Sequence, residues 1–153
     1  MLRILRIAVP VAVASVLGSG VAAAQYQNTT RVGSYLAYHF DVRDPGVGAQ
    51  LDVPITPRFA LYPSGGVFLV DQGSLWGVNA DVKYWLASPL YFGGGLNIMQ
   101  RSVAGTDRTD AGVNLLTGVE GHMSRRLHPF AEGRVILNEG SAFLLGAGLR
   151  IAL

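Results

Sequence analysis

The sequence has 153 residues, no cysteine and only 14% charged residues, whereas about 25% is usual for soluble globular domains. The missing cysteine excludes a disulfide scaffold, a zinc ribbon and thiol chemistry. The low share of charge, together with a hydrophobic share of 50%, excludes a disordered chain. The length is enough for one domain and too short for two.

The charge balance gives no sign of a nucleic-acid partner. The 12 lysines and arginines include Arg3 and Arg6, so from Gln25 onward 10 bases stand against 10 acids. The formal net charge of +2 therefore comes entirely from the first 24 residues. A neutral body lacks the basic footprint that nucleic-acid binding requires.

Residues 1–24 are predicted to be a cleaved signal peptide. Arg3 and Arg6 supply a positive start, residues 7–17 form an apolar core, and small alanines precede a cut before Gln25. The alternative is a retained membrane helix, since this stretch approaches the roughly 20 residues that span a bilayer. Polar and glycine residues in the second half of the stretch favour cleavage, so we expect export.

Residues 25–153 follow a hydrophobic period of two, which indicates strands. In the segment 76–86, for example, every second residue from Trp76 is apolar, and Asn79, Asp81 and Lys83 lie between them. The pattern predicts eight strands, at residues 32–40, 47–55, 58–70, 76–86, 90–99, 111–120, 130–137 and 142–153. The third is the least regular, because Pro63 cannot donate to a ladder; we expect a bulge or an early strand end there.

The strand lengths favour a membrane barrel. Most predicted strands have about 9 to 12 residues, close to the ~9 to 11 that cross a bilayer and longer than the ~5 to 6 of soluble sheets. The predicted connections are residues 41–46, 56–57, 71–74, 87–89, 100–110, 122–127 and 138–141. The longest of these, residues 100–110, is predicted to be an ordinary solvated loop.

The second face of the alternation is predicted to line the interior. It consists mainly of glycine, with Gln50, Asn79, Asn97 and Asn114, and its only lysine is Lys83. Small residues suit the inside of a narrow eight-stranded barrel, whereas a wet exterior would need many charges. The alternative is a secreted or periplasmic soluble barrel whose apolar face points inward around a small apolar ligand.

Seven charged residues on this second face are predicted to form an interior polar network, because isolated buried charges are costly. They are Asp52, Asp81, Lys83, Glu120, Glu132, Arg134 and Arg150. The functional alternatives are a polar pore or a catalytic carboxylate pair. Because eight strands leave no room for a channel, we expect a salt-bridged interior that holds the barrel together.

Aromatic residues near the strand ends are predicted to form interfacial girdles, as in membrane barrels. They are Tyr38, Phe40, Phe59, Trp76, Tyr84, Tyr91, Phe92 and Phe143.

With an export signal and eight alternating strands, the chain resembles the small outer-membrane β-barrel proteins of Gram-negative bacteria, of the OmpA-membrane-domain, OmpX and OmpW kind. In that family the last strand carries a glycine and alternating apolar residues and ends in an aromatic residue, which the barrel-assembly machinery reads. Gly148, Ile151 and Leu153 match this assembly signal, although Leu153 replaces the aromatic residue.

The resemblance implies an all-β, eight-stranded antiparallel up-and-down transmembrane β-barrel in the outer membrane. It implies as partners the membrane lipid with lipopolysaccharide and, during insertion, the barrel-assembly machinery. It also places both chain ends and the turns 56–57, 87–89 and 122–127 in the periplasm. The role expected is structural or in surface interaction, and the sequence does not predict the oligomeric state.

No catalytic, cofactor or metal site is predicted. His122 and Ser124 have the spacing of a His-x-Ser pair found in lipid A deacylases among small outer-membrane barrels, but Arg125 follows where that family has asparagine. The three histidines are far apart and lack the spacing of a metal-binding motif.

Overall fold

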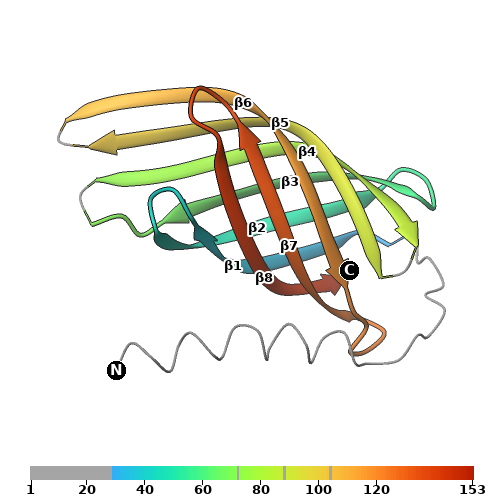
Figure 1. Ribbon diagram of the computed structural model, residues 1–153. Coiled ribbons are helices and arrows are strands. Elements are labelled where there is room, and N and C mark those ends of the chain that lie inside the picture. Colours follow the sequence, from blue (N-terminus) through green and yellow to red (C-terminus); the bar gives the residue numbers. More distant parts are fainter. Residues whose placement is uncertain (1–28, 72, 88, 104) are drawn as a thin grey trace.

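The computed structural model describes residues 29–71, 73–87, 89–103 and 105–153, and the predicted signal peptide lies outside these described residues. Eight strands follow one another: β1 Arg31–His39, β2 Asp44–Pro54, β3 Phe59–Phe68, β4 Ser74–Ala87, β5 Leu90–Val103, β6 Thr106–Glu120, β7 Leu127–Leu137 and β8 Ala142–Ala152. Each pairs antiparallel with the next, and β1 closes the barrel on β8 (Figure 1). The predicted all-β up-and-down barrel is confirmed.

The barrel has two distinct ends. The turns β1–β2, β3–β4, β5–β6 and β7–β8 lie together at one end, which we call the hairpin end (Figure 1). The other three turns lie with the start of β1 and the end of β8 at the opposite end, which we call the terminal end. Along the part of the chain that the structure describes, no helix is long and apolar enough to cross a membrane.

Alternation along each strand separates an apolar outside from a mixed inside. On β4, Val78 and Val82 are exposed on the outer face, while Asp81 and Lys83 between and beside them are buried. Exposed apolar side chains occur on all eight strands, and Leu36 is 70% exposed. Successive side chains of a strand point to opposite faces, so the sequence period of two directly produces this division.

The third strand is more regular than the sequence indicates, and the predicted bulge or early end at Pro63 is wrong. β3 continues through Pro63 and pairs with β4 along its whole length. On the β2 side the ladder has a gap opposite Leu51 and Asp52, yet the register is the same before and after it. Because proline lacks an N–H, it removes a ladder bond here without shifting the strand.

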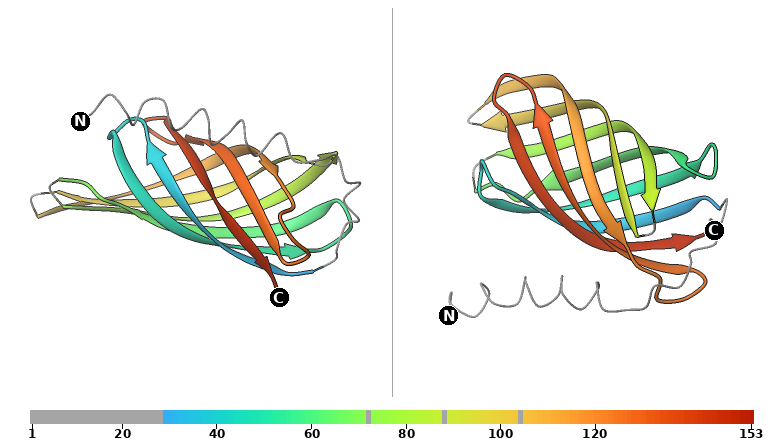
Figure 2. Two further views of the ribbon diagram at one scale, coloured as in Figure 1. Left: turned by 90° about the horizontal axis from the view of Figure 1, so that it is seen from below. Right: turned by 45° about the vertical axis from the view of Figure 1, so that its right-hand side comes forward.

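The connections predicted at residues 41–46, 100–110 and 122–127 are shorter in the structure, because strands extend into them. β2 starts at Asp44, and β7 starts at Leu127 within the predicted turn. The predicted loop at residues 100–110 is a hairpin, in which β5 runs to Val103 and β6 resumes at Thr106. Figure 2 shows this hairpin protruding beyond the β1–β2 and β7–β8 turns.

Candidate functional site: the barrel interior and outer surface

The interior is layered, and β4 shows the order of the layers. From the terminal end to the hairpin end, its inward residues are Trp85, Lys83, Asp81, Asn79, Gly77 and Leu75. The charged residues therefore lie in the terminal half, neutral amides lie in the middle, and an apolar residue lies near the hairpin end.

Glu120 on β6 holds two arginines at the terminal end of the interior. Arg31 Nη1 donates to Glu120 Oε1 at 2.8 Å, and Arg150 Nη1 donates to Glu120 Oε2. His128 Nδ1 lies 3.7 Å from Glu120 Oε1. All four side chains are buried, so each charge depends on its partners rather than on water.

Arg150 reaches a second carboxylate through two tyrosine hydroxyls. Its Nη2 donates to the hydroxyl oxygens of Tyr62 at 2.7 Å and Tyr91 at 3.0 Å. Each hydroxyl lies 3.0 Å from Glu132 Oε2. Arg150, which is completely buried, thereby links Glu132 to Glu120 in one network.

Lys83 lies in an aromatic box and forms an ion pair with Asp52. Its Nζ is 4.7 Å from the ring centroid of Tyr62, 4.5 Å from that of Trp85 and 4.8 Å from that of Tyr91. Cation–π attraction is strengthened when the cation is removed from water, and Lys83 is completely buried.

Arg134 connects the network to the middle of the barrel. Its Nη1 lies 2.8 Å from Asp81 Oδ2, and its Nη2 donates to Glu132 Oε1 at 3.1 Å. Asn114 Nδ2 donates to Asp81 Oδ1 at 2.6 Å. Asp81 therefore receives both a charged and a neutral partner.

The structure brings all seven sequence-predicted interior residues together. They form a chain of ion pairs that is completed by Arg31, which lies 4.0 Å from Asp52 and 2.8 Å from Glu120. The chain runs through Lys83, Asp52, Arg31, Glu120, Arg150, Glu132, Arg134 and Asp81. Its four cations balance its four carboxylates, so the interior has no formal net charge.

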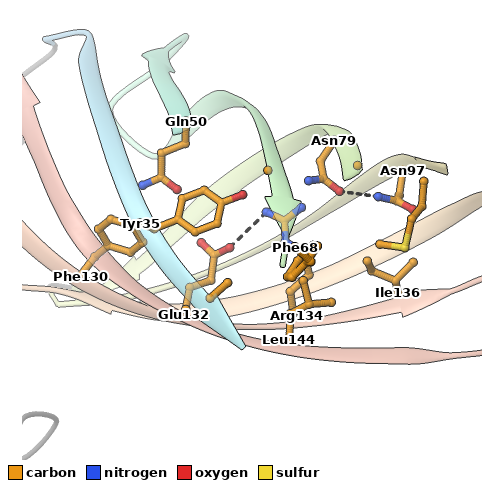
Figure 3. Close-up of a pocket in the computed structure, with 15 residues that line it drawn as sticks. Tyr35, Gln50, Phe68, Asn79, Asn97, Phe130, Glu132, Arg134, Ile136 and Leu144 are labelled. Atoms are coloured by element: carbon orange, nitrogen blue, oxygen red, sulfur yellow. Dashed lines mark hydrogen bonds and ion pairs between the residues drawn. The ribbon is translucent and has the colours of Figure 1, made fainter. Parts of the chain in front are cut away.

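A cavity of about 40 Å³ lies above the network, toward the hairpin end. Figure 3 shows it lined by Tyr35, Asn79, Asn97, Glu132 and Arg134, among others. Asn97 Nδ2 donates to Asn79 Oδ1 at 2.8 Å across one wall. The volume suits a few water molecules.

An apolar cluster closes the interior at the hairpin end. Ala37, Phe68 and Leu75 are buried there, and Met99 and Leu144 pack against them. These residues come from five of the eight strands. The small cavity lies between this cluster and the ion-pair network.

The sequence did not predict that Arg31, Tyr62 and His128 are buried in the interior. Arg31 and His128 precede the predicted strand starts, and Tyr62 adjoins Pro63 in the irregular third segment. Tyr91 was predicted to belong to a girdle, and that prediction is wrong, because Tyr91 is 1% exposed. Its even spacing from the interior glycines of β5 was the available signal.

The His122–Ser124 segment forms an ordinary exposed turn. Ser124 Oγ accepts from the backbone N–H groups of Arg126 and Leu127 at 3.3 and 3.1 Å. The hydroxyl therefore stabilises the turn, and His122 instead packs against the His128 ring at 4.7 Å between centroids. Among the described residues, no group of three or more His, Asp or Glu side chains could hold a metal ion.

Outward aromatic residues gather at two levels. They lie in two clusters, Tyr38, Phe40 and Phe143 at the hairpin end and Phe59, Tyr84 and Phe92 at the terminal end. Neighbouring ring centroids within them are 4.8 to 5.2 Å apart. An apolar wall between two aromatic levels is the arrangement of membrane barrels.

The predicted assembly-signal residues lie on or directly after β8, the strand that closes the barrel. A Cβ at Gly148 would collide with the backbone of Ser34 and Tyr35, so β1 and β8 approach closely there. Ile151 and Leu153 are 51% and 75% exposed. Recognition of these residues by the assembly machinery stays a prediction.

The soluble-barrel alternative requires an apolar lumen and a polar wall, and the structure has the reverse. A closed eight-stranded barrel with a polar interior and an apolar exterior has the architecture of the transmembrane β-barrels.

Solved structures of that class are similar to this chain. The N-terminal β-barrel domain of OprF from Pseudomonas aeruginosa superposes with a TM-score of 0.73 at 15% identity, covering 84% of this chain and 100% of that domain. Neisserial surface protein A gives 0.61 at 17% identity, with 81% and 96% covered, and a de novo designed transmembrane β-barrel gives 0.54 at 17%, with 84% and 98% covered. No family model and no curated protein sequence matches this chain. The likeness therefore concerns the fold, and the fold expected from the family resemblance is confirmed.

Proposed function

We propose that this chain is an integral outer-membrane β-barrel protein with a structural or surface-interaction role, without an open pore and without catalysis. The observation that carries this proposal is the apolar outer wall of a closed barrel, because such a wall is stable in lipid and costly in water. The similar fold of the OprF barrel domain supports the outer membrane as the location.

The filled interior supports the absence of a pore. The ion-pair network occupies the terminal half, the apolar cluster occupies the hairpin end, and the cavity between them has only about 40 Å³. Buried ion pairs here connect strands β1, β2, β4, β6, β7 and β8 across the lumen. The network therefore serves to brace the wall.

The protruding β5–β6 hairpin supports a role in surface interaction. Within the described residues, β7 pairs with β6 only from Val113 on, so the preceding part of β6 is an open edge on that side. Arg108, on this edge, donates from Nε to Asp110 Oδ1 of the same strand at 2.9 Å. Its Nη2 donates to Glu139 Oε2 of the β7–β8 turn at 2.5 Å. The hydrogen bond to Asp110 raises the pKa of the Arg108 guanidinium above its usual value. Open strand edges are recognised by strand addition.

Two measurements test the proposal. Washing isolated outer membranes with urea removes soluble and peripheral proteins, and the protein is expected to remain in the membrane pellet. Reconstitution in a planar bilayer is expected to give no stepwise conductance. Release by urea would contradict the membrane location, and regular conductance steps would contradict the closed interior.

A further inference from the structure

The charged residues of the barrel are divided unequally between its two ends. The interior holds four bases and four acids, so of the ten bases and ten acids from Gln25 onward six of each lie outside it. All six outer acids lie at the hairpin end, namely Asp41, Asp44, Asp71, Asp107, Asp110 and Glu139. They are accompanied there by three bases, Arg43, Arg101 and Arg108.

The terminal end has the opposite charge. Among the described residues, its exposed charged side chains are Arg58, Arg125 and Arg126, and no acidic side chain accompanies them. With histidine neutral, three bases against no acids give +3 at this end, and three bases against six acids give −3 at the hairpin end. The neutral total therefore conceals a strongly polarised molecule.

Arg58 lies at the level of the terminal aromatic cluster. Its Nη1 lies 3.4 Å from the Tyr84 hydroxyl, and Phe59 follows it directly in the chain. Tyr84 in turn lies between Phe59 and Phe92, with centroids 4.8 and 5.2 Å away. Aromatic girdles mark the headgroup level of a bilayer, which is also the level of the lipid phosphates.

Arg125 and Arg126 lie across the barrel from Arg58. They belong to the β6–β7 turn, whereas Arg58 belongs to the β2–β3 turn, and four strands separate the two turns in either direction around the ring. The Arg126 carbonyl accepts from the Ala152 backbone N–H at 2.9 Å, which fixes the turn beside the end of β8. Cations on opposite sides of a rim fit a flat anionic surface and do not converge on one small ligand.

We propose that Arg58, Arg125 and Arg126 bind the phosphates of anionic phospholipid headgroups in the leaflet at the terminal end. This inference rests on the proposed function, because it requires the barrel to span a membrane. The three arginines hold the terminal end at the surface from which the barrel inserts, and the acidic hairpin end crosses to the other side. Attraction to an anionic surface acts within about a Debye length, so it is effective for exposed residues at the rim.

The test compares folding of the urea-unfolded full chain into vesicles of phosphatidylcholine, with and without phosphatidylglycerol, at low salt. A variant carrying R58Q, R125Q and R126Q removes the terminal arginines. The matched control carries R43Q, R101Q and R108Q at the hairpin end and lowers the net charge by the same amount. A third variant replaces the terminal arginines by lysine and keeps the charge.

Phosphatidylglycerol is expected to speed folding of the wild type, the hairpin-end control and the lysine variant by about ten-fold or more. The terminal glutamine variant is expected to lose this gain while still folding into phosphatidylcholine at the wild-type rate. An equal gain in both glutamine variants, or loss of the gain in the lysine variant, would overturn the inference and leave the proposed function intact. If the wild type folds into neither kind of vesicle, the proposed function itself fails.

Discussion

Arg150 joins the two halves of the interior ion-pair network through its guanidinium group. It donates to Glu120 and to the hydroxyls of Tyr62 and Tyr91, and its guanidinium carbon lies 4.0 Å from the ring centroid of Phe130. The planar guanidinium group offers five donors in a fixed fork and stacks on rings, whereas a lysine ammonium offers three donors and does not stack. One side chain thereby connects β8 to β3, β5, β6 and β7.

Replacing Arg150 by methionine is expected to lower the free energy of unfolding by about 3 to 5 kcal/mol, because Glu120 and Glu132 would lose a buried partner. Urea unfolding of the protein folded in vesicles measures this loss. The control is Arg101→Met, which removes an exposed arginine at the hairpin end and is expected to leave the unfolding midpoint unchanged. Equal effects of the two substitutions would show that the interior network does not brace the barrel.

At the same scale, the charged interior residues could be predicted from the sequence because each alternates with outward apolar residues of its strand. Glu132 and Arg134, for example, lie two residues apart between apolar neighbours. The partners of these charges were harder to predict. An aromatic ring suits a lipid-facing girdle as well as the surroundings of an interior cation. For Tyr91 the spacing from the β5 glycines favoured the interior, whereas for Tyr62, beside Pro63, only the three-dimensional arrangement distinguishes the two.

At the scale of the strand, the β5–β6 hairpin shows where hydrophobic periodicity fails. Residues 100–103 and 106–110 pair in regular register but carry polar side chains on both faces. Outside the membrane both faces of a strand meet water. Neither face then requires an apolar residue at every second position, so the period of two disappears. The sequence therefore predicts the transmembrane part of a strand and underestimates its extension.

Pro63 gives a second test at this scale. In Pro63→Ala, the new amide is expected to donate to β2 and to exchange its hydrogen slowly, and the free energy of unfolding is expected to rise by about 1 kcal/mol. Hydrogen exchange followed by NMR measures the protection at this position. The amide created by Pro57→Ala, in the β2–β3 turn, is expected to exchange rapidly. Rapid exchange at position 63 would mean that the ladder gap has another cause.

The outward face of β4 gives a third test. Val82 is 43% exposed, lies opposite Leu61 and Gly94, and is two residues from Tyr84 in the direction of the hairpin end. Val82→Arg is expected to cost up to about 2 to 4 kcal/mol, because an arginine on the lipid face of the wall loses its hydration. The yield of folded protein in the outer membrane measures the effect, with Val82→Leu as the control. Normal yield of the arginine variant would contradict the assignment of this face to lipid.

At the scale of the whole molecule, closure of the sheet gives each strand a hydrogen-bonded neighbour on both sides within the barrel wall. β1 and β8 pair over nine residues, from Arg31 opposite Ala152 to His39 opposite Leu144. In lipid every backbone polar group must find its partner inside the protein, and a closed barrel provides such partners throughout. The open edge of β6 lies only in the protruding hairpin, where water is available.

A gel-mobility comparison of boiled and unboiled samples from washed outer membranes tests whether this closed, apolar-walled barrel resides in the outer membrane. A closed membrane barrel resists detergent until it is heated. The protein is therefore expected to stay with the membrane fraction and to give a band that shifts on boiling. Recovery of the protein in the soluble periplasmic fraction, without a heat-dependent shift, would contradict the outer-membrane location.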